Sequence, residues 1–225
     1  MGDPTVQLRM ESALTTLLRE EISVLGCGRT DSGVHANQFF LHFDTSAEPN
    51  ADELVYRLNG ILDLDIAVKR LIAVDSEAHA RFDATERTYR YFIHNEKNPF
   101  LNDRSTFVPA DLDIESMNQA ALLLTQFEDF KAFAKVNPDL NHHRCDVRHA
   151  QWTGGDGRWM FEISANRFLR NMVRAVVGTL LEVGQGKLDE SGFRAVVESR
   201  DRSKAGKSVD AKGLFLHRIK YPYIQ

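Results

Sequence analysis

The chain has 225 residues, of which 43% are apolar and 27% charged, and its formal net charge is −4. This composition is typical of a globular protein and excludes one that coats nucleic acid through many cation–phosphate contacts. A basic groove remains possible, because the clustering of Lys and Arg matters more than their sum. No apolar run of about 18 residues occurs, which excludes a membrane span. Cys27 and Cys145 cannot build a disulfide framework, so we expect a reduced, cytoplasmic protein.

The first half of the chain alternates helical and strand-like patterns. Apolar residues recur every three or four positions from 5 to 20, as in an amphipathic helix. Asn50 is a typical helix cap, and Asp52 and Glu53 suit the first turn of the helix that follows it. Runs rich in β-branched and aromatic residues favour strands. We predict helices over 5–20 and 51–62 and strands over 22–27, 38–44, 65–74 and 87–94.

The second half repeats this mixture after a polar link at 95–104. Asp113 and Asp189 are typical caps for two helices, and residues 154–157 suit the turn of a hairpin. We predict helices over 114–124, 127–133, 168–183 and 190–199, strands over 144–153, 158–165 and 214–221, and a polar loop over 137–143. Antiparallel-looking strands without strict βαβα alternation favour an α+β fold over a doubly wound parallel one.

The loop at 28–36 is the most informative segment, because it places Arg29 and Asp31 between two apolar strands. Gly28 and Gly33 allow tight turns, and loops held by rigid strands often carry catalytic groups. A carboxylate in such a loop can act as a nucleophile, a general base or a metal ligand. Asp31 can equally close the turn with its own side chain. The residues alone leave both interpretations open.

A second candidate is the predicted strand over 87–94, in which Arg87, Tyr89 and Tyr91 share one face. Aromatic residues interleaved with Arg suit a surface on which a base stacks while phosphates are held nearby. A half-buried edge strand, whose amphipathic side chains cover apolar surface, would show the same pattern. This segment therefore also has two readings.

A third candidate is the predicted helix after residue 166. Helical spacing would place Arg167, Arg170 and Arg174 on one face. The opposite, core-facing side would carry Leu169, Met172, Val173, Val176 and Val177. Three guanidinium groups on one face would bind phosphates of a substrate or a carboxylate. A solvated basic stripe is the alternative.

Motifs for metal, nucleotide or serine chemistry are missing from the sequence. The His pair at 142–143 and Cys145 lack the paired spacing of zinc ligands. No Gly-rich phosphate loop with its following Lys occurs, and no serine lies in a nucleophile elbow. We therefore expect neither a metal nor an organic cofactor. A metal-dependent phosphodiesterase that uses Asp31, His35 and His42 is a weaker alternative.

Residues 28–36, which read GRTDSGVHA, resemble the signature loop of the tRNA pseudouridine synthase A family. Further blocks resemble that family in the same order along nearly the whole chain. These blocks are Gln38, His42-Phe43, residues 79–84, residues 87–91, Asp129-Phe130 with Phe133, residues 166–178, and residues 213–216 ahead of Tyr221-Pro222. Several blocks in one order make a chance match improbable.

The resemblance implies a role for each matching residue. Asp31 matches the catalytic aspartate that attacks the target nucleoside, and Arg29 matches the arginine that helps to displace the base from its stack. Tyr89 matches the tyrosine that stacks on the uracil. Arg174 matches the arginine that ion-pairs with the catalytic carboxylate, and Leu214 matches a hydrophobic residue that lines the pocket. Displacing a base costs on the order of a few kcal/mol, which an inserted Arg and a stacking Tyr would offset.

The resemblance also implies an activity, an assembly and a fold. The family converts uridine to pseudouridine at positions 38, 39 and 40 in the anticodon stem-loop of tRNAs, without a metal or cofactor, as a homodimer. Its pseudouridine synthase fold has two similar α+β halves whose antiparallel sheets form a central cleft. We expect residues 1–98 to carry the catalytic loop and residues 99–225 to complete the cleft. A non-catalytic protein of the same fold that binds structured RNA is the alternative.

One feature of the sequence departs from the family pattern. The family begins with a β-strand and a Gly-Trp-Gln loop before its first helix, whereas Thr5-Val6-Gln7 already corresponds to that helix here. We therefore expect the first half to lack one strand and to expose an unpaired sheet edge.

Overall fold

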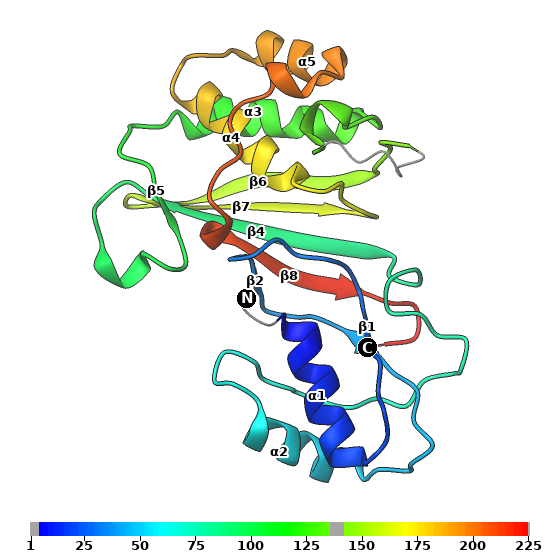
Figure 1. Ribbon diagram of the computed structural model, residues 1–225. Coiled ribbons are helices and arrows are strands. Elements are labelled where there is room, and N and C mark those ends of the chain that lie inside the picture. Colours follow the sequence, from blue (N-terminus) through cyan, green and yellow to red (C-terminus); the bar gives the residue numbers. More distant parts are fainter. Residues whose placement is uncertain (1–4, 136–141, 225) are drawn as a thin grey trace. The chain divides into compact units, whose positions relative to one another are not determined.

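The computed structural model describes residues 5–135 and 142–224, which form two compact units (Figure 1). Unit 1 comprises residues 5–29 and 40–83, and unit 2 comprises residues 30–39 and the described residues from 84 onward. These boundaries differ from those of the predicted halves, 1–98 and 99–225, because the strand after residue 85 pairs within the sheet of unit 2. The predicted roles of the two halves in a cleft stay a prediction.

Unit 1 is built from two helices and a short pair of strands. Helix α1 (Val6–Leu18) is capped by Thr5, whose side chain accepts a hydrogen bond from the Leu8 amide. Helix α2 (Ala51–Ile61) is capped in the same way by Asn50, as predicted. Strands β1 (Leu25–Gly26) and β3 (Leu41–His42) pair antiparallel. Buried apolar side chains from both helices and from the chain before β1 form the core: Met10, Ala13, Leu14, Ile22, Val24, Leu54 and Leu58.

The strand predicted over 65–74 is wrong, because residues 66–75 have no regular secondary structure. The side chain of Asn59 makes the contacts that a neighbouring strand would make. Its amide donates to the Val68 carbonyl and its carbonyl accepts from the Val68 amide, both at 2.8 Å. Ile66, Val68 and Leu71 pack against the unit 1 core. The apolar pattern of this segment therefore reflects burial rather than sheet pairing.

The sheet of unit 2 is centred on β4 (Glu86–His94), which pairs antiparallel with β7 (Arg158–Ala165) on one side and β8 (Leu214–Lys220) on the other. The strand order is β2-β8-β4-β7-β6, and β5 also pairs with β4. The remaining strands are β2 (His35–Ala36), β5 (Thr106–Phe107) and β6 (Val147–Gly155). Strand β2 is parallel to β8 and β5 is parallel to β4, so the sheet is mixed.

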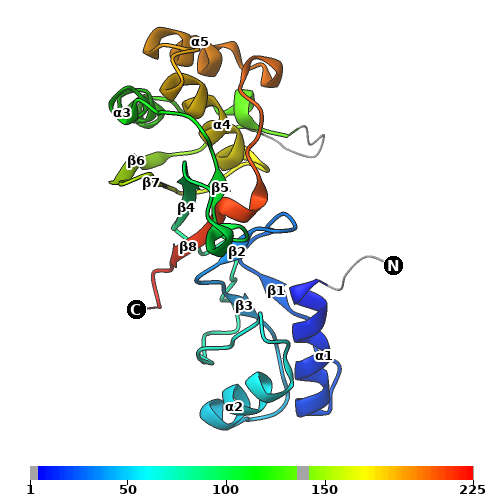
Figure 2. The ribbon, with the colours of Figure 1, turned by 90° about the vertical axis from the view of Figure 1, so that its left-hand side faces the viewer.

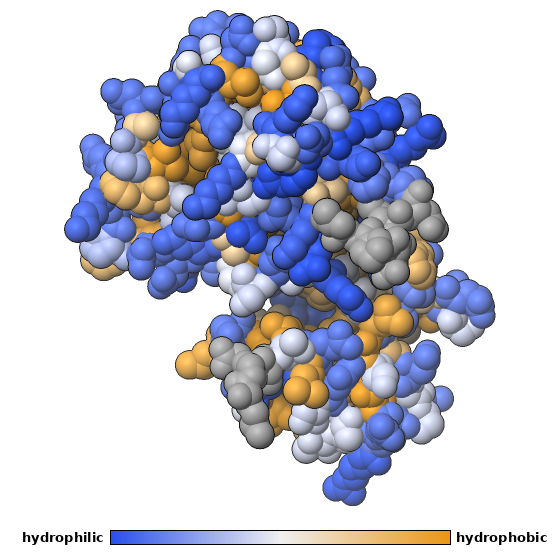
Figure 3. Space-filling view, turned by 45° about the horizontal axis from the view of Figure 1, so that its top comes forward, coloured by the Kyte–Doolittle hydropathy of each residue, from blue (hydrophilic) through white to orange (hydrophobic). Residues whose placement is uncertain are grey.

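Helices α3 (Ile114–Leu123), α4 (Met172–Gly184) and α5 (Glu190–Ser199) lie on one side of this sheet (Figures 1 and 2). Alternate strand residues face the helices, so Tyr91, Ile93, Phe161 and Ile163 are all buried in one core with α4. Short 3₁₀ turns complete the unit: Pro99–Leu101, Leu124–Gln126, Lys131–Phe133, Arg202–Lys204 and Ala211–Gly213. Hydrophilic side chains cover most of the face of unit 2 that Figure 3 shows, with smaller apolar areas between them.

The α+β class is confirmed, as are the β4 strand, the β6–β7 hairpin and the helices capped by Asp113 and Asp189. Other predictions fail at their boundaries. The strands predicted over 22–27 and 38–44 are limited to Leu25–Gly26 and Leu41–His42. The helix predicted over 168–183 begins only at Met172, and the one predicted over 127–133 is a 3₁₀ turn limited to Lys131–Phe133. The polar loop predicted over 137–143 lies mostly outside the described residues. No helix in the described ranges is long and apolar enough to cross a membrane.

Candidate active site

The turn that carries Asp31 is closed by backbone groups and fixed to the sheet of unit 2. The Val34 amide donates to the Asp31 carbonyl at 3.1 Å, and Gly33 adopts a φ of 80°, which favours glycine. The next two residues, β2, pair with β8, and the His35 ring stacks on Phe215 with centroids 4.5 Å apart. The chain therefore leaves the turn in a fixed direction.

The Asp31 side chain is directed to Arg174 rather than back to its own turn. The Arg174 guanidinium Nη1 lies 3.0 Å from Asp31 Oδ2, and the two side chains are 21% and 33% exposed, respectively. Arg174 Nε also donates to the Val209 carbonyl at 2.7 Å. The first turn of α4 thus holds a guanidinium against a partly exposed carboxylate. The carboxylate is thus held in position and partly accessible, two properties that a nucleophile needs. Its role as the nucleophile stays a prediction.

Tyr89 lies on β4, which is separated from β2 by strand β8. Its partners are Ile163 on β7 and Leu216 on β8. The ring packs edge-on against Phe168, with centroids 5.1 Å apart and an interplanar angle of 86°. Leu214 is buried on the same side of the sheet, at 6% exposure, opposite Tyr91. The half-buried ring of Tyr89 therefore has a rigid support, as a stacking platform requires.

The three arginines predicted to share a helical face do not do so. Residues 166–171 precede α4 as a bend, an irregular stretch and a turn, so Arg167 and Arg170 are not helical. Arg167 Nη1 lies 3.4 Å from His142 Nε2, and Arg170 is exposed while its carbonyl accepts from the Lys135 amide. Only Arg174 meets Asp31. The late helix start coincides with the packing of Phe168 and Leu169 against the unit 2 core and with a φ of 67° at Asn171, which is not helical. Substrate binding by Arg167 and Arg170 stays a prediction.

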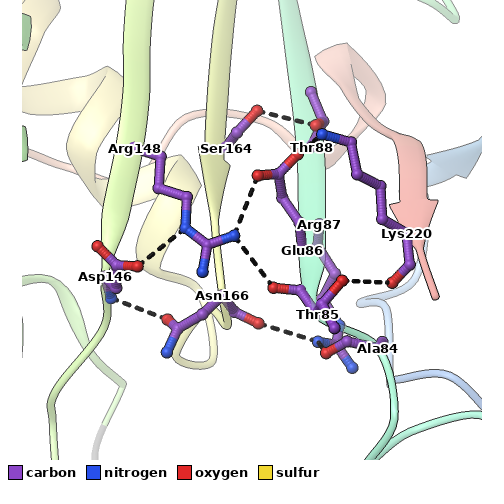
Figure 4. Close-up of polar contacts among 10 residues, drawn as sticks. All are labelled: Ala84, Thr85, Glu86, Arg87, Thr88, Asp146, Arg148, Ser164, Asn166 and Lys220. Atoms are coloured by element: carbon purple, nitrogen blue, oxygen red, sulfur yellow. Dashed lines mark hydrogen bonds and ion pairs between the residues drawn. The ribbon is translucent and has the colours of Figure 1, made fainter. Parts of the chain in front are cut away.

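The start of this segment is held by a polar network at the end of the sheet (Figure 4). Asn166 accepts from the Asp146 amide through its side chain, at 2.8 Å, and from Arg87 Nη1 through its carbonyl, at 3.0 Å. Arg148 joins Asp146 to Glu86 by two further ion pairs, at 2.8 and 3.1 Å. Arg87, which the sequence suggested as a phosphate-binding residue, thus contributes to this network. The network links β4 and β6 to the residues that precede β6 and follow β7, and no local sequence signal identifies it.

Arg29 lies in unit 1, and its side chain is exposed. The sequence places it two residues before Asp31, but the structure provides no further test of its predicted part in base displacement. That role stays a prediction.

The histidines of the metal-dependent alternative take part in other hydrogen bonds. His35 Nε2 lies 2.8 Å from the Asp103 carbonyl, and His42 Nδ1 accepts from the Ala80 amide at 3.0 Å. In residues 5–135 and 142–224, no group of three or more His, Cys, Asp or Glu side chains could hold a metal ion.

Known proteins resemble this chain along nearly its whole length. A family model described as tRNA pseudouridine synthase matches residues 121–222. The tRNA pseudouridine synthase A of Parabacteroides distasonis is 48% identical over 220 residues, which cover 97% of this chain and 87% of that protein. The protein of the same name from Porphyromonas gingivalis is 44% identical (97% and 88% covered), and that from Bacillus licheniformis is 37% identical (98% and 91% covered). This chain therefore belongs to the tRNA pseudouridine synthase family, as its resemblance predicted.

Proposed function

We propose that this chain is an isomerase that converts uridine to pseudouridine at positions 38, 39 and 40 in the anticodon stem-loop of tRNAs. The observation that carries the proposal is the ion pair between Asp31 and Arg174, which joins residues 143 positions apart. A carboxylate placed by a guanidinium, on a rigid turn and partly open to solvent, is suited to attack a substrate. Membership in the family supplies the substrate class.

The chemistry needs no external reactant. The bond between uracil N1 and ribose C1′ breaks, a bond between C5 and C1′ forms, the proton leaves C5, and N1 gains a proton. Asp31 serves as the nucleophile while the base is detached. Tyr89, supported by Phe168, stacks on the uracil, because aromatic faces bind flipped or unpaired bases. Arg29 fills the place of the displaced base, Leu214 lines the pocket, and Arg167 and Arg170 bind phosphates.

We propose further that the enzyme acts as a cytoplasmic homodimer and uses neither a metal nor an organic cofactor. The resemblance to the family supports the dimer and the absence of a cofactor. Burial of both cysteines, Cys27 and Cys145, is compatible with a reducing compartment.

The test uses tRNA transcripts that carry a single uridine at position 38, 39 or 40, incubated with the chain in parallel with and without EDTA. Carbodiimide-based primer extension then maps pseudouridine. We expect new stops at each of the three positions and none in a transcript that lacks all three uridines. Tight tRNA binding without any new stop would instead identify a non-catalytic RNA-binding protein. Conversion that EDTA abolishes would contradict the metal-free mechanism.

A further inference from the structure

Residues 205–210, here called the strap, run directly over helix α4. A Cβ atom on Gly178 would lie 1.9 Å from the Lys207 carbonyl oxygen, and one on Gly206 would lie 2.9 Å from the Gly178 backbone. The strap and the helix therefore approach this closely only because both positions are glycine. The Gly206 amide also donates to Thr179 Oγ1 at 2.9 Å. The strap is thus fixed to the second turn of α4.

Ser208 is the central side-chain contact of the strap. Its Oγ accepts from Arg202 Nη2 at 2.8 Å and from Asn171 Nδ2 at 2.6 Å. Arg202 Nη1 donates to the carbonyls of Ala205 and Gly206, at 3.2 and 3.1 Å. Asn171, which immediately precedes α4, has a φ of 67°, a conformation that Asn tolerates better than most residues. One hydroxyl therefore joins the strap to both the 3₁₀ turn before it and the start of α4.

The residue after Ser208 contacts the candidate site directly. The Val209 carbonyl accepts from Arg174 Nε at 2.7 Å, and the Val209 amide donates to the Arg174 carbonyl at 3.2 Å. The Tyr91 hydroxyl donates to the carbonyl of Asp210, the next residue, at 2.9 Å. The guanidinium of Arg174 is consequently held on one edge by Val209 and on the other by Asp31.

We propose that Ser208 and Arg202 are positioning residues for pseudouridine formation. They fix the Val209 carbonyl, which in turn orients the Arg174 guanidinium toward Asp31. Neither side chain needs to touch the RNA. This inference rests on the proposed function, because it assigns the strap a part in the same reaction.

The kinetic test compares Ser208→Ala, Ser208→Thr and the matched control Ser203→Ala. Ser203 is exposed and its hydroxyl bonds only to Asp201 in the described contacts. We expect Ser208→Ala to lower kcat at least about tenfold with an unchanged KM for tRNA, because small shifts of a catalytic group are costly. Ser208→Thr, which keeps the hydroxyl, should restore most of kcat. A kcat for Ser208→Ala within threefold of the control would overturn the proposal.

A second comparison separates positioning from a general loss of structure. In an Arg174→Met background, Ser208→Ala should cause no further loss of kcat, because both changes disable the same contact. An equal loss in both backgrounds would contradict the proposal. Urea unfolding of each variant confirms that the chains are folded at the assay temperature.

A third measurement does not depend on activity. The Nε–H proton of Arg174, assigned by its disappearance in Arg174→Lys, should exchange with solvent faster in Ser208→Ala than in the parent or in Ser203→Ala. Equal exchange in all three would refute the positioning role even if the enzyme is active. If the parent forms no pseudouridine but the exchange differs as expected, the proposed function fails while the contact is upheld.

Discussion

Arg174→Met is the substitution that most directly probes the ion pair. It removes the hydrogen bonds to Asp31 Oδ2 (3.0 Å) and to the Val209 carbonyl (2.7 Å), while the methionine retains much of the apolar stem. Both bonds are donated by the charged guanidinium, and a hydrogen bond that involves a charged group contributes about 1.5–3 kcal/mol when it is shielded from solvent. Because the Arg174 and Asp31 side chains are 21% and 33% exposed, solvent weakens the pair. We therefore expect unfolding to require about 2 kcal/mol less.

A domain of ordinary stability remains folded after a loss of about 2 kcal/mol. The effect on the reaction should be larger, because Asp31 is no longer held in place and a shift of about 1 Å costs on the order of 100-fold in rate. Arg174→Lys keeps the charge but offers one nitrogen in place of a planar fork, and should lose about tenfold.

The assay measures single-turnover pseudouridine formation at saturating enzyme, with tRNA binding followed separately by fluorescence anisotropy. Urea unfolding at pH 7 provides the stability difference. A rate for Arg174→Met within tenfold of the parent, in a chain that is folded and binds tRNA normally, would refute the claim that the pair organises catalysis.

Other predictions concern the stacking residue, a buried thiol and the polar network. Tyr89→Leu should lower kcat/KM about tenfold or more, whereas Tyr89→Phe should stay close to the parent, because a base stacked on an aromatic ring gains about 1–3 kcal/mol. Equal losses of kcat/KM for the two variants in steady-state assays would contradict stacking. Burial raises the pKa of Cys145 to about 12, so iodoacetamide at pH 8 should modify it only in urea, and mass spectrometry showing rapid modification of the folded chain would contradict this. The hydrogen bond from Lys220 lowers the pKa of Glu86 below its ordinary 4.5. The stabilisation that the Glu86 carboxylate gives the folded state is therefore present above pH 4.5 and is lost as the pH falls through the lowered pKa. Glu86→Gln should therefore cost about 1 kcal/mol at pH 7 and progressively less below pH 4.5, which urea unfolding across pH would show; a constant difference would contradict it.

Local signals in the sequence predict the helices well. Asn50, Asp113 and Asp189 each cap the helix that follows them, because a side-chain oxygen accepts from the amide three residues later. The failures have long-range causes. Residues 66–75 contain strand-forming side chains, yet the contacts that replace sheet pairing come from Asn59 on α2. Pairing between a side chain and a backbone leaves no periodic pattern in the sequence, so strand propensity alone does not reveal it.

The candidate site likewise has parts that the local sequence reveals and parts that it does not. The loop around Asp31 is recognisable locally, but its ion-pair partner, Arg174, lies 143 residues later in the chain. Helical spacing grouped Arg174 with two arginines that lie outside the helix, and only the family resemblance singled it out. The Val209 carbonyl could not be predicted, since a backbone acceptor carries no residue signature. Ser208 and Arg202, which hold it, show no motif of their own.

The most direct test of the central claim is the single-turnover rate of Asp31→Asn on an unmodified tRNA, with binding measured in the same samples. The substitution keeps the size of the side chain and removes the negative charge that a nucleophilic carboxylate requires. We predict that tRNA binds within a few-fold of the parent while no pseudouridine forms. Conversion by Asp31→Asn or Asp31→Ala within tenfold of the parent would contradict the assignment of Asp31 as the nucleophile.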